Sequence, residues 1–240
     1  MESGPDNVIE LAGVRKTYGE GAVAIHALRG VDLAIQQGEF VVLLGASGSG
    51  KTTLLNMIGG IEAPSEGRIR VAGQELSEMD EERLTQFRRD TVGFIFQFFN
   101  LIPTLTAEEN VELIAELSGG DAATRSEEAL RGVALAERSD HFPSQLSGGE
   151  QQRVAVARAI ASDPAILLGD EPTGALDLET GRRVLDLLAS VAESKHRTIL
   201  LVTHNATIAQ MANRVIRLRD GAIVGDERNE NPLAAADLDW

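Results

Sequence analysis

Residues 45–52, GASGSGKT, have the composition of a phosphate-binding loop. Glycines let consecutive backbone N–H groups turn toward phosphate oxygens, and a helix starting here would add its partial positive charge. Lys51 would reach the β- and γ-phosphates as a compact charge, and Thr52 would offer a hydroxyl to Mg²⁺. The sequence therefore predicts nucleotide contacts at Gly45, Ala46, Ser47, Gly48, Ser49, Gly50, Lys51, Thr52 and Thr53.

Two carboxylates follow an apolar segment at residues 165–171, AILLGDE. Beside a phosphate loop, Asp170 is placed to order Mg²⁺ and its waters. Glu171 is then placed to polarise a water that attacks the terminal phosphate. Without the loop, the ordinary interpretation would be a buried strand that ends in solvated acids, so the loop decides between the two.

A second helix start that could bind an anion lies at residues 146–153, LSGGEQQR. Ser147, Gly148 and Gly149 open this helix, and its backbone N–H groups together with the helix dipole would attract a phosphate. Ser147 and Glu150 also have the spacing of a capping box, and we expect that as well. A single fold would gain little from two phosphate-binding helix starts unless both of them face the same triphosphate.

In this order and spacing, the phosphate loop, LSGGEQQR and LLGDEPTGALD resemble the ATP-binding cassette (ABC) ATPases. The resemblance extends from Tyr18 to His204. It implies a head-to-tail homodimer around two ATP molecules with Mg²⁺, which is a two-fold assembly. It also implies that Asp177 couples the two sites. The residues that would act in trans on the partner's ATP are Ser147, Gly148, Gly149 and Asp177.

The same resemblance assigns roles to three further positions. Tyr18 would stack on adenine, although a tyrosine at a strand edge is the plain alternative. Gln97 would contact Mg²⁺ or the attacking water. His204 would sense the γ-phosphate, whereas a lone histidine at a strand end is usually structural. The implied catalytic residues are thus Glu171, His204 and Gln97, and the implied Mg²⁺ ligands are Thr52, Gln97 and Asp170.

One position departs from the family pattern. Gly169 stands where a larger apolar residue usually precedes the aspartate, and we expect only a slight loosening of the strand end.

The elements that must position these residues alternate between strands and helices. The resemblance implies an α/β fold, a P-loop NTPase core with an antiparallel β subdomain and an inserted α-helical subdomain. We expect one domain over 1–240, with the core at 1–97 and 163–240 and the insertion at 98–162. The last dozen residues suggest a loosely held acidic tail. Strands are expected at 8–15, 23–28, 31–35, 39–44, 69–71, 92–96, 165–168, 198–202, 215–218 and 222–224, and helices at 52–58, 79–89, 107–117, 126–136, 148–161 and 179–193.

Composition excludes several classes of protein. The 240 residues are 43% hydrophobic and 25% charged, which is ordinary globular usage. A net charge of −15 argues against nucleic acid and against adhesion to an anionic membrane. The chain has no cysteine, an acidic N-terminus and no apolar run of the roughly 18–20 residues that a membrane helix needs. The expected location is cytoplasmic, peripheral on the inner face of the membrane through an integral membrane permease, without direct insertion.

A cluster of aromatic residues follows the strand at 92–96. Phe98, Phe99, Leu101 and Ile102 come just before the helical insertion. They form either a small core beneath the insertion or an apolar notch that receives a short helix from the membrane partner.

The longer motif phrases look most like the lipoprotein-release and macrolide-export branch of the family. The predicted function is an ATP-hydrolysing transporter subunit that drives a membrane partner. A cell-division-type ATPase that signals without transport is the alternative, and amino-acid importers are more distant. A nucleic-acid-acting cassette, a P-loop kinase or GTPase, and a module without turnover each conflict with a feature of the sequence.

Overall fold

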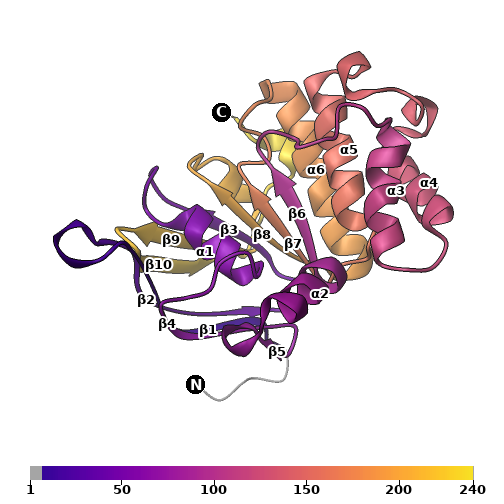
Figure 1. Cartoon of the computed structure of the whole chain (residues 1–240). Helices are drawn as coiled ribbons and strands as arrows, with labels where there is room; N and C mark the ends of the chain where they lie inside the picture. The colour runs from indigo at the N-terminus through magenta and orange to yellow at the C-terminus, as the bar shows by residue number, and fades with distance from the viewer. Residues whose placement is uncertain (1–6, 240) are drawn as a thin grey trace.

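The computed structural model describes residues 7–239, apart from the side chains of Ala22, Ser194 and Lys195. Its strands form two sheets, and helices lie beside and between them (Figure 1). The four-stranded sheet is antiparallel in its described pairings, in the order β2 (Ile25–Gln36), β1 (Asn7–Tyr18), β4 (Glu66–Val71) and β5 (Gln74–Glu75). The six-stranded sheet has the order β10 (Ala222–Arg228), β9 (Arg214–Arg219), β3 (Phe40–Leu44), β8 (Thr198–Thr203), β7 (Ile166–Asp170) and β6 (Val92–Phe96).

All pairings of the six-stranded sheet are parallel except that of the edge strand β10. The strands β3 and β8 are buried along their whole length. Their sequences, FVVLL and TILLVT, are nearly continuous apolar runs because helices or the second sheet cover both faces. Consecutive parallel strands end at the same edge, so the segments that follow them meet there.

Two hydrophobic clusters occupy the two faces of this sheet. Alternate residues of β3 divide between them, with Val42 and Leu44 in one cluster and Val41 and Leu43 in the other. The first cluster packs the sheet against α3, α5 and α6, and the second packs it against α1 and the antiparallel sheet. The α-helices are α1 (Lys51–Ile58), α2 (Glu81–Thr91), α3 (Ala107–Leu117), α4 (Ala122–Gly132), α5 (Gly148–Ile160) and α6 (Leu178–Lys195).

This arrangement confirms the expected α/β fold class, with an antiparallel sheet and a group of helices added to a parallel core. Figure 1 shows α3, α4, α5 and α6 together on one side of the molecule. Across residues 7–239, no helix combines the length and the apolar character required to cross a membrane. Short 3-10 turns are η1 (Gly21–Val23), η2 (Leu76–Glu78), η3 (Ala136–Arg138), η4 (Pro143–Gln145), η5 (Ile208–Met211) and η6 (Ala235–Asp237).

Three expected elements were clearly wrong in their bounds. The strands expected at 23–28 and 31–35 are one strand, β2, because Gly30 with φ +96° forms a bulge where the pairing with β1 shifts by a residue. The helix expected at 126–136 begins at Ala122 instead. Asp121 caps it by accepting a hydrogen bond from the Thr124 N–H, and the chain leaves the helix after Gly132.

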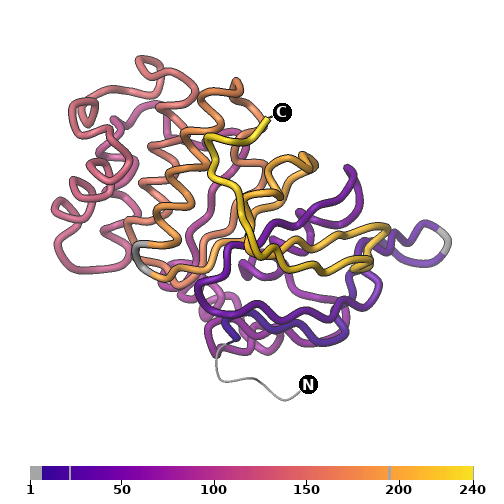
Figure 2. Tube along the Cα trace, turned by 180° about the vertical axis from the view of Figure 1, so that it is seen from behind, coloured from indigo at the N-terminus to yellow at the C-terminus, as the bar shows by residue number. Residues whose placement is uncertain are grey.

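The loosely held tail was also wrong. Leu238 is fully buried and Ala235 is 2% exposed, both within the first hydrophobic cluster. The side chain of Arg182 donates from Nε to the Leu238 carbonyl at 2.7 Å. Figure 2 shows the yellow C-terminal segment lying along the orange turns of α6. Apolar residues spaced among the acids therefore dock this segment, although its only charged residues are acids.

Leu238→Ala is expected to lower the free energy of unfolding by about 2–5 kcal/mol, because the substitution removes a buried side chain and leaves a cavity. The measurement is urea unfolding followed by circular dichroism. Leu233→Ala is the matched control, since Leu233 is 41% exposed and its loss should cost much less. Equal effects of the two substitutions would contradict the docking of this segment.

Candidate functional site

A cavity of about 690 Å³ opens at the carboxyl ends of the parallel strands. Residues following β3, β6, β7 and β8 all reach it, because these strands are neighbours in register. Apart from Ala27, every residue in its lining is one that the sequence predicts. The lining residues from the loop are Ala46, Ser47, Gly48, Gly50, Lys51, Thr52 and Thr53. Those from the other strand ends are Gln97, Asp170, Glu171 and His204.

The loop between β3 and α1 wraps around the ammonium group of Lys51. Its Nζ donates to the carbonyls of Gly45 at 2.8 Å and Ala46 at 3.0 Å, and the residue is only 7% exposed. Gly50 is the N-cap residue of α1 and has φ +101°, and a Cβ there would lie 2.5 Å from the Ala27 carbonyl oxygen. Only glycine fits this position, so the loop conformation is set by sequence and by the neighbouring β2 strand.

Two of the predicted loop contacts support the loop from behind. Gly45 and Ser49 are not in the cavity lining, and the Ser49 hydroxyl is buried with no hydrogen-bond partner in the described structure. A Cβ at Gly45 would lie 2.5 Å from that hydroxyl and 2.4 Å from the Leu218 carbonyl oxygen. The Gly221 N–H donates to the Ser49 carbonyl at 3.0 Å. These contacts fix the loop against the turn between β9 and β10.

Thr52 and Asp170 bring two oxygen atoms together at the edge of the cavity. The Thr52 hydroxyl donates to Oδ2 of Asp170 at 3.0 Å. Burial and the nearby Glu171 charge raise the pKa of Asp170, while the Thr52 hydrogen bond and Lys51 oppose that rise. Within residues 7–239, no cluster of three or more acidic or histidine side chains could enclose a metal. The oxygen pair instead suits Mg²⁺, which takes one or two protein ligands together with substrate phosphates.

Glu171 is held in an uncommon backbone conformation, with φ +48°. Its carboxylate accepts from the Thr203 hydroxyl at 2.9 Å and from the His204 N–H at 2.9 Å. Nδ1 of His204 lies 2.6 Å from Oε1 of the same carboxylate. The glutamate side chain is 17% exposed and the histidine 70%. The end of β8 therefore fixes the carboxylate, and the imidazole covers it from the solvent side.

Gln97 follows the last residue of β6 and lies against the turn after Glu171. A Cβ at Gly174 would lie 2.9 Å from Nε2 of Gln97, so the glycine leaves room for the amide. The Gly174 N–H in turn donates to the Glu171 carbonyl at 2.9 Å. The predicted catalytic glutamine and glutamate are therefore adjacent through this turn.

Tyr18 stands apart from the cavity lining and is 39% exposed. Its hydroxyl donates to Oε2 of Glu62 at 2.5 Å, and Nζ of Lys16 lies 5.1 Å from the ring centroid. Burial, followed by the Glu62 hydrogen bond, raises the pKa of Tyr18. Sequence reasoning missed Glu62, because this residue lies in the loop between α1 and β4 and no local motif connects it with a tyrosine far away on β1.

The residues predicted to act in trans lie at the starts of α5 and α6, outside this cavity's lining. Ser147 forms the expected capping box with Glu150, donating from its backbone N–H to Oε2 of Glu150 at 2.8 Å. Asp177 caps α6 by accepting from the Thr180 N–H at 3.1 Å. The same Ser147 bonds lower the pKa of Glu150, and the bonds from Thr180 lower that of Asp177.

The starts of α5 and α6 touch through two residues. A Cβ at Gly149 would lie 2.1 Å from Cγ2 of Thr180, so only glycine allows this approach. A Cβ at Gly148 would lie in ordinary contact, 3.6 Å from the ring of Phe99. Gly149 therefore has a packing role within its own chain, whatever it contacts elsewhere.

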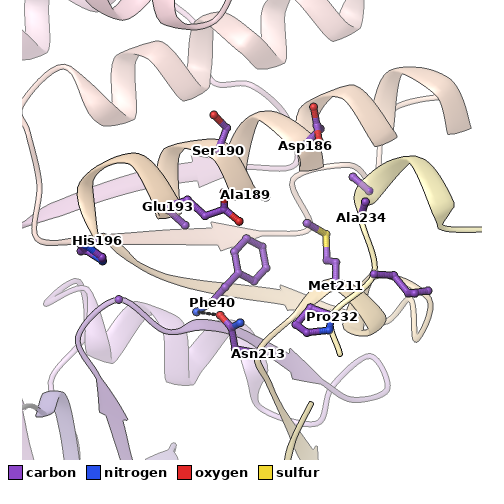
Figure 3. Close-up of a pocket in the computed structure, with 14 residues that line it drawn as sticks. Phe40, Asp186, Ala189, Ser190, Glu193, His196, Met211, Asn213, Pro232 and Ala234 are labelled. Carbon is purple, nitrogen blue, oxygen red and sulfur yellow. Dashed lines mark hydrogen bonds between the residues drawn. The ribbon is translucent and has the colours of Figure 1, made fainter. Parts of the chain in front are cut away.

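A second cavity, of about 760 Å³, lies between α6 and the C-terminal segment. Figure 3 shows Phe40 and Met211 beneath α6, with Pro232 and Ala234 on the C-terminal side. None of the predicted site residues is in its lining. The predicted site residues therefore gather at the smaller of these two cavities.

Comparisons with known proteins find similar chains. A family model described as ABC transporter matches residues 28–174. The chain is 46% identical over 228 residues to an uncharacterised ABC transporter ATP-binding protein, MJ0796, of Methanocaldococcus jannaschii, covering 92% of this chain and 97% of that protein. It is 44% identical over 233 residues to the macrolide export ATP-binding/permease protein MacB of Marinobacter nauticus, covering 96% of this chain and 36% of that protein.

A solved structure is also similar to this chain. A dimeric structure of a post-hydrolysis state of the cassette MJ0796, bound to ADP and Pi, has a TM-score of 0.85 and 43% identity, covering 93% of this chain and 99% of that one. The chain thus corresponds to nearly all of one relative and to about a third of the macrolide-export relative.

Gly149→Ala is expected to destabilise the protein by about 1–3 kcal/mol through overpacking against Thr180. Without the clash, the same change inside a helix would stabilise by up to about 1 kcal/mol. Thr180→Ser removes the methyl group, so the double variant should recover most of the loss. Thermal unfolding gives the stability of Gly149→Ala, of Thr180→Ser and of the double variant. A Gly149→Ala variant as stable as the parent would contradict the close contact between Gly149 and Thr180.

Proposed function

This chain belongs to the ABC transporter family of ATP-binding proteins, and we propose that it is the ATP-hydrolysing subunit that drives a membrane export system. One observation carries the proposal. The structure gathers Lys51, the Thr52–Asp170 oxygen pair and the Glu171 carboxylate around one cavity at the strand ends. These are the groups needed to bind a nucleoside triphosphate with Mg²⁺ and to activate a water beside it.

The phosphates bind to backbone N–H groups of the loop and to Lys51. The ammonium group already lies at the centre of the loop, where it interacts with the Gly45 and Ala46 carbonyls. Thr52, Gln97 and Asp170 would hold Mg²⁺, which would supply charge neutralisation on the phosphate oxygens. The sequence's assignment of these ligands is retained in the proposal.

Glu171 accepts a proton from the attacking water. The water oxygen forms a bond to the γ-phosphorus as the bond to the ADP oxygen breaks, and phosphate leaves. A left-handed conformation costs a residue other than glycine about 1–3 kcal/mol, and Glu171 adopts it while its carboxylate is held by Thr203 and His204. His204 and Thr203 orient the carboxylate, and His204 is placed to sense the γ-phosphate.

Tyr18 stacks on the adenine ring. Its hydroxyl is fixed by Glu62, and the ammonium group of Lys16 bonds the Ala63 carbonyl at 2.8 Å and lies 3.5 Å from Glu62. This network lowers the freedom of the ring before nucleotide binds, which favours stacking. We therefore prefer stacking to the strand-edge alternative, because the side chains of Glu62 and Lys16 both hold this exposed tyrosine.

A second copy of the chain completes each site. In the proposed head-to-tail dimer, Ser147, Gly148 and Gly149 approach the γ-phosphate bound by the partner, and Asp177 couples the two sites. The start of α5 supplies helix N-terminal backbone N–H groups and a helix dipole for this purpose. The dimeric structure of MJ0796 with ADP and Pi supports the assembly.

The membrane partner docks beside the helical insertion, which we assign to residues 98–162 within a single domain over 1–240, the core being 1–97 and 163–240. Phe98 is 72% and Ile102 38% exposed, whereas Leu101 packs against the core. Nearby, Phe94 and Leu117 help to line an apolar groove of about 450 Å³. Of the two alternatives that the sequence left open, we assign Leu101 to the small core beneath the insertion and Phe98 and Ile102 to the notch.

We place the protein on the cytoplasmic face of the membrane, bound through a permease without inserting itself and without a nucleic-acid partner. The combined ATP-binding/permease name of the Marinobacter nauticus relative supports an export partner. None of the relatives reported above has a cell-division name, so the signalling alternative is not favoured.

Glu171→Gln is expected to bind ATP with parental affinity but to hydrolyse it at least about 100-fold more slowly, because the loop and Lys51 are intact while the base is lost. The variant should also accumulate as an ATP-held dimer in size-exclusion chromatography. Lys51→Ala is the comparison variant and should lose ATP binding instead. Hydrolysis by Glu171→Gln at the parental rate would rule out the assigned base.

Phe98→Asp is expected to release the protein from its membrane partner while basal ATPase activity remains, because it places a charge on the proposed apolar surface. Co-purification with the native membrane fraction is the measurement. Val224→Asp is the matched control, since Val224 is 51% exposed on β10 at the opposite edge of the sheet. If both variants co-purify as well as the parent, the partner docks elsewhere.

A further inference from the structure

A buried glutamine joins the start of α5 to the ends of two strands. Gln152 is fully buried, and its Nε2 donates to the Pro172 carbonyl at 2.7 Å and to the Phe96 carbonyl at 3.2 Å. Pro172 directly follows Glu171, and Phe96 directly precedes Gln97. One amide group thus holds the backbone next to both of these residues.

The two carbonyls belong to neighbouring chain segments. Phe96 ends β6 and pairs with Asp170 at the end of β7, so the two strands diverge just beyond this point. The amide bridges the gap where strand pairing stops. On the other side of the same turn, Gly174 contacts the Gln97 amide. The separation of Gln97 and Glu171 is therefore set from two sides.

Gln152 uses the donors of its side-chain amide but not the acceptor. Both acceptors face the NH₂ group, and Oε1 is buried without a hydrogen-bond partner in the described structure. Leaving a buried acceptor unsatisfied is unfavourable, so simple filling of space would be better served by an apolar side chain. The donors are what this position requires.

We propose that Gln152 is a positioning residue that holds Gln97 and Glu171 in their working geometry and links this geometry to the start of α5. The inference rests on the proposed function, in which Glu171 acts on the chain's own ATP and Ser147 on the partner's. Since Gln152 and Ser147 lie on the first turns of one helix, a shift of that helix at one site moves the backbone beside the other.

Gln152→Met keeps an unbranched side chain of similar length but removes both donors. The expected result is a fall in kcat of about 10- to 100-fold, the scale of a small misplacement of catalytic groups, with KM for ATP changed less than about twofold. ATP-binding groups on the loop are untouched by the substitution. Ser126→Ala is the control for loss of a buried hydrogen bond, because Ser126 is fully buried and donates to the Glu108 carbonyl in the helical group.

Gln152→Glu supplies a second measurement that does not depend on the methionine variant being folded. A protonated glutamic acid can donate one hydrogen bond to the carbonyls, and the ionised form can donate none. Burial favours the protonated form. The ratio of the variant's kcat to the parental kcat should therefore increase as pH falls, whereas loss of packing alone would give a ratio independent of pH.

The outcomes separate cleanly. A selective loss of kcat in Gln152→Met, with a pH-dependent ratio for Gln152→Glu, supports the inference. Parental kcat with only a lowered Tm, like that of Ser126→Ala, or a flat ratio, overturns it. If Glu171→Gln hydrolyses ATP at the parental rate, the proposed function fails first. If Glu171→Gln is inactive and Gln152→Met is fully active, only the positioning role fails.

Discussion

The register of four parallel strands is the constraint on which the rest of this protein depends. The strands β3, β8, β7 and β6 pair in that order, and each ends at the same edge of the sheet. Their buried, apolar sequences leave no freedom to slip, because a shift by one residue would exchange the side chains between the two hydrophobic clusters. The hydrogen bonds between these strands therefore bring the phosphate loop, Asp170, Glu171 and Gln97 to one cavity.

Electrostatics at that cavity is local and does not follow the net charge of −15. The loop presents backbone N–H groups, a helix start and the largely buried Lys51, while the acids that face it are Asp170 and Glu171. The raised pKa of Asp170 reflects burial and the neighbouring carboxylate. Such an arrangement is suited to a bound cation and phosphates, which would relieve the repulsion between the acids.

Tight contacts connect this site with the helices beside it. Gly149 meets Thr180 where α5 and α6 begin, and Gln152 reaches back to the ends of β6 and β7. The C-terminal segment adds a further connection, since Arg182 of α6 bonds Leu238 and the Thr207 hydroxyl donates to the Asp239 carbonyl. The segment after His204 and the helix after Asp177 are thus held together. Close-packed contacts of this kind transmit displacements instead of absorbing them.

The sequence by itself determined the class of fold and predicted nearly all of the residues that line the cavity. Motifs such as GASGSGKT are local, because a few consecutive residues supply both the turn and the ligands, and the apolar strands before this loop and before Glu171 could be recognised from composition. Only the tertiary structure decided the partners that lie far apart in the chain: Glu62 beneath Tyr18, Thr180 against Gly149, and Gln152 between Phe96 and Pro172. It also decided that Gly30 continues a strand and that Leu238 is buried. These contacts depend on which surfaces pack together once the sheet has formed, and the local sequence pattern does not specify that packing.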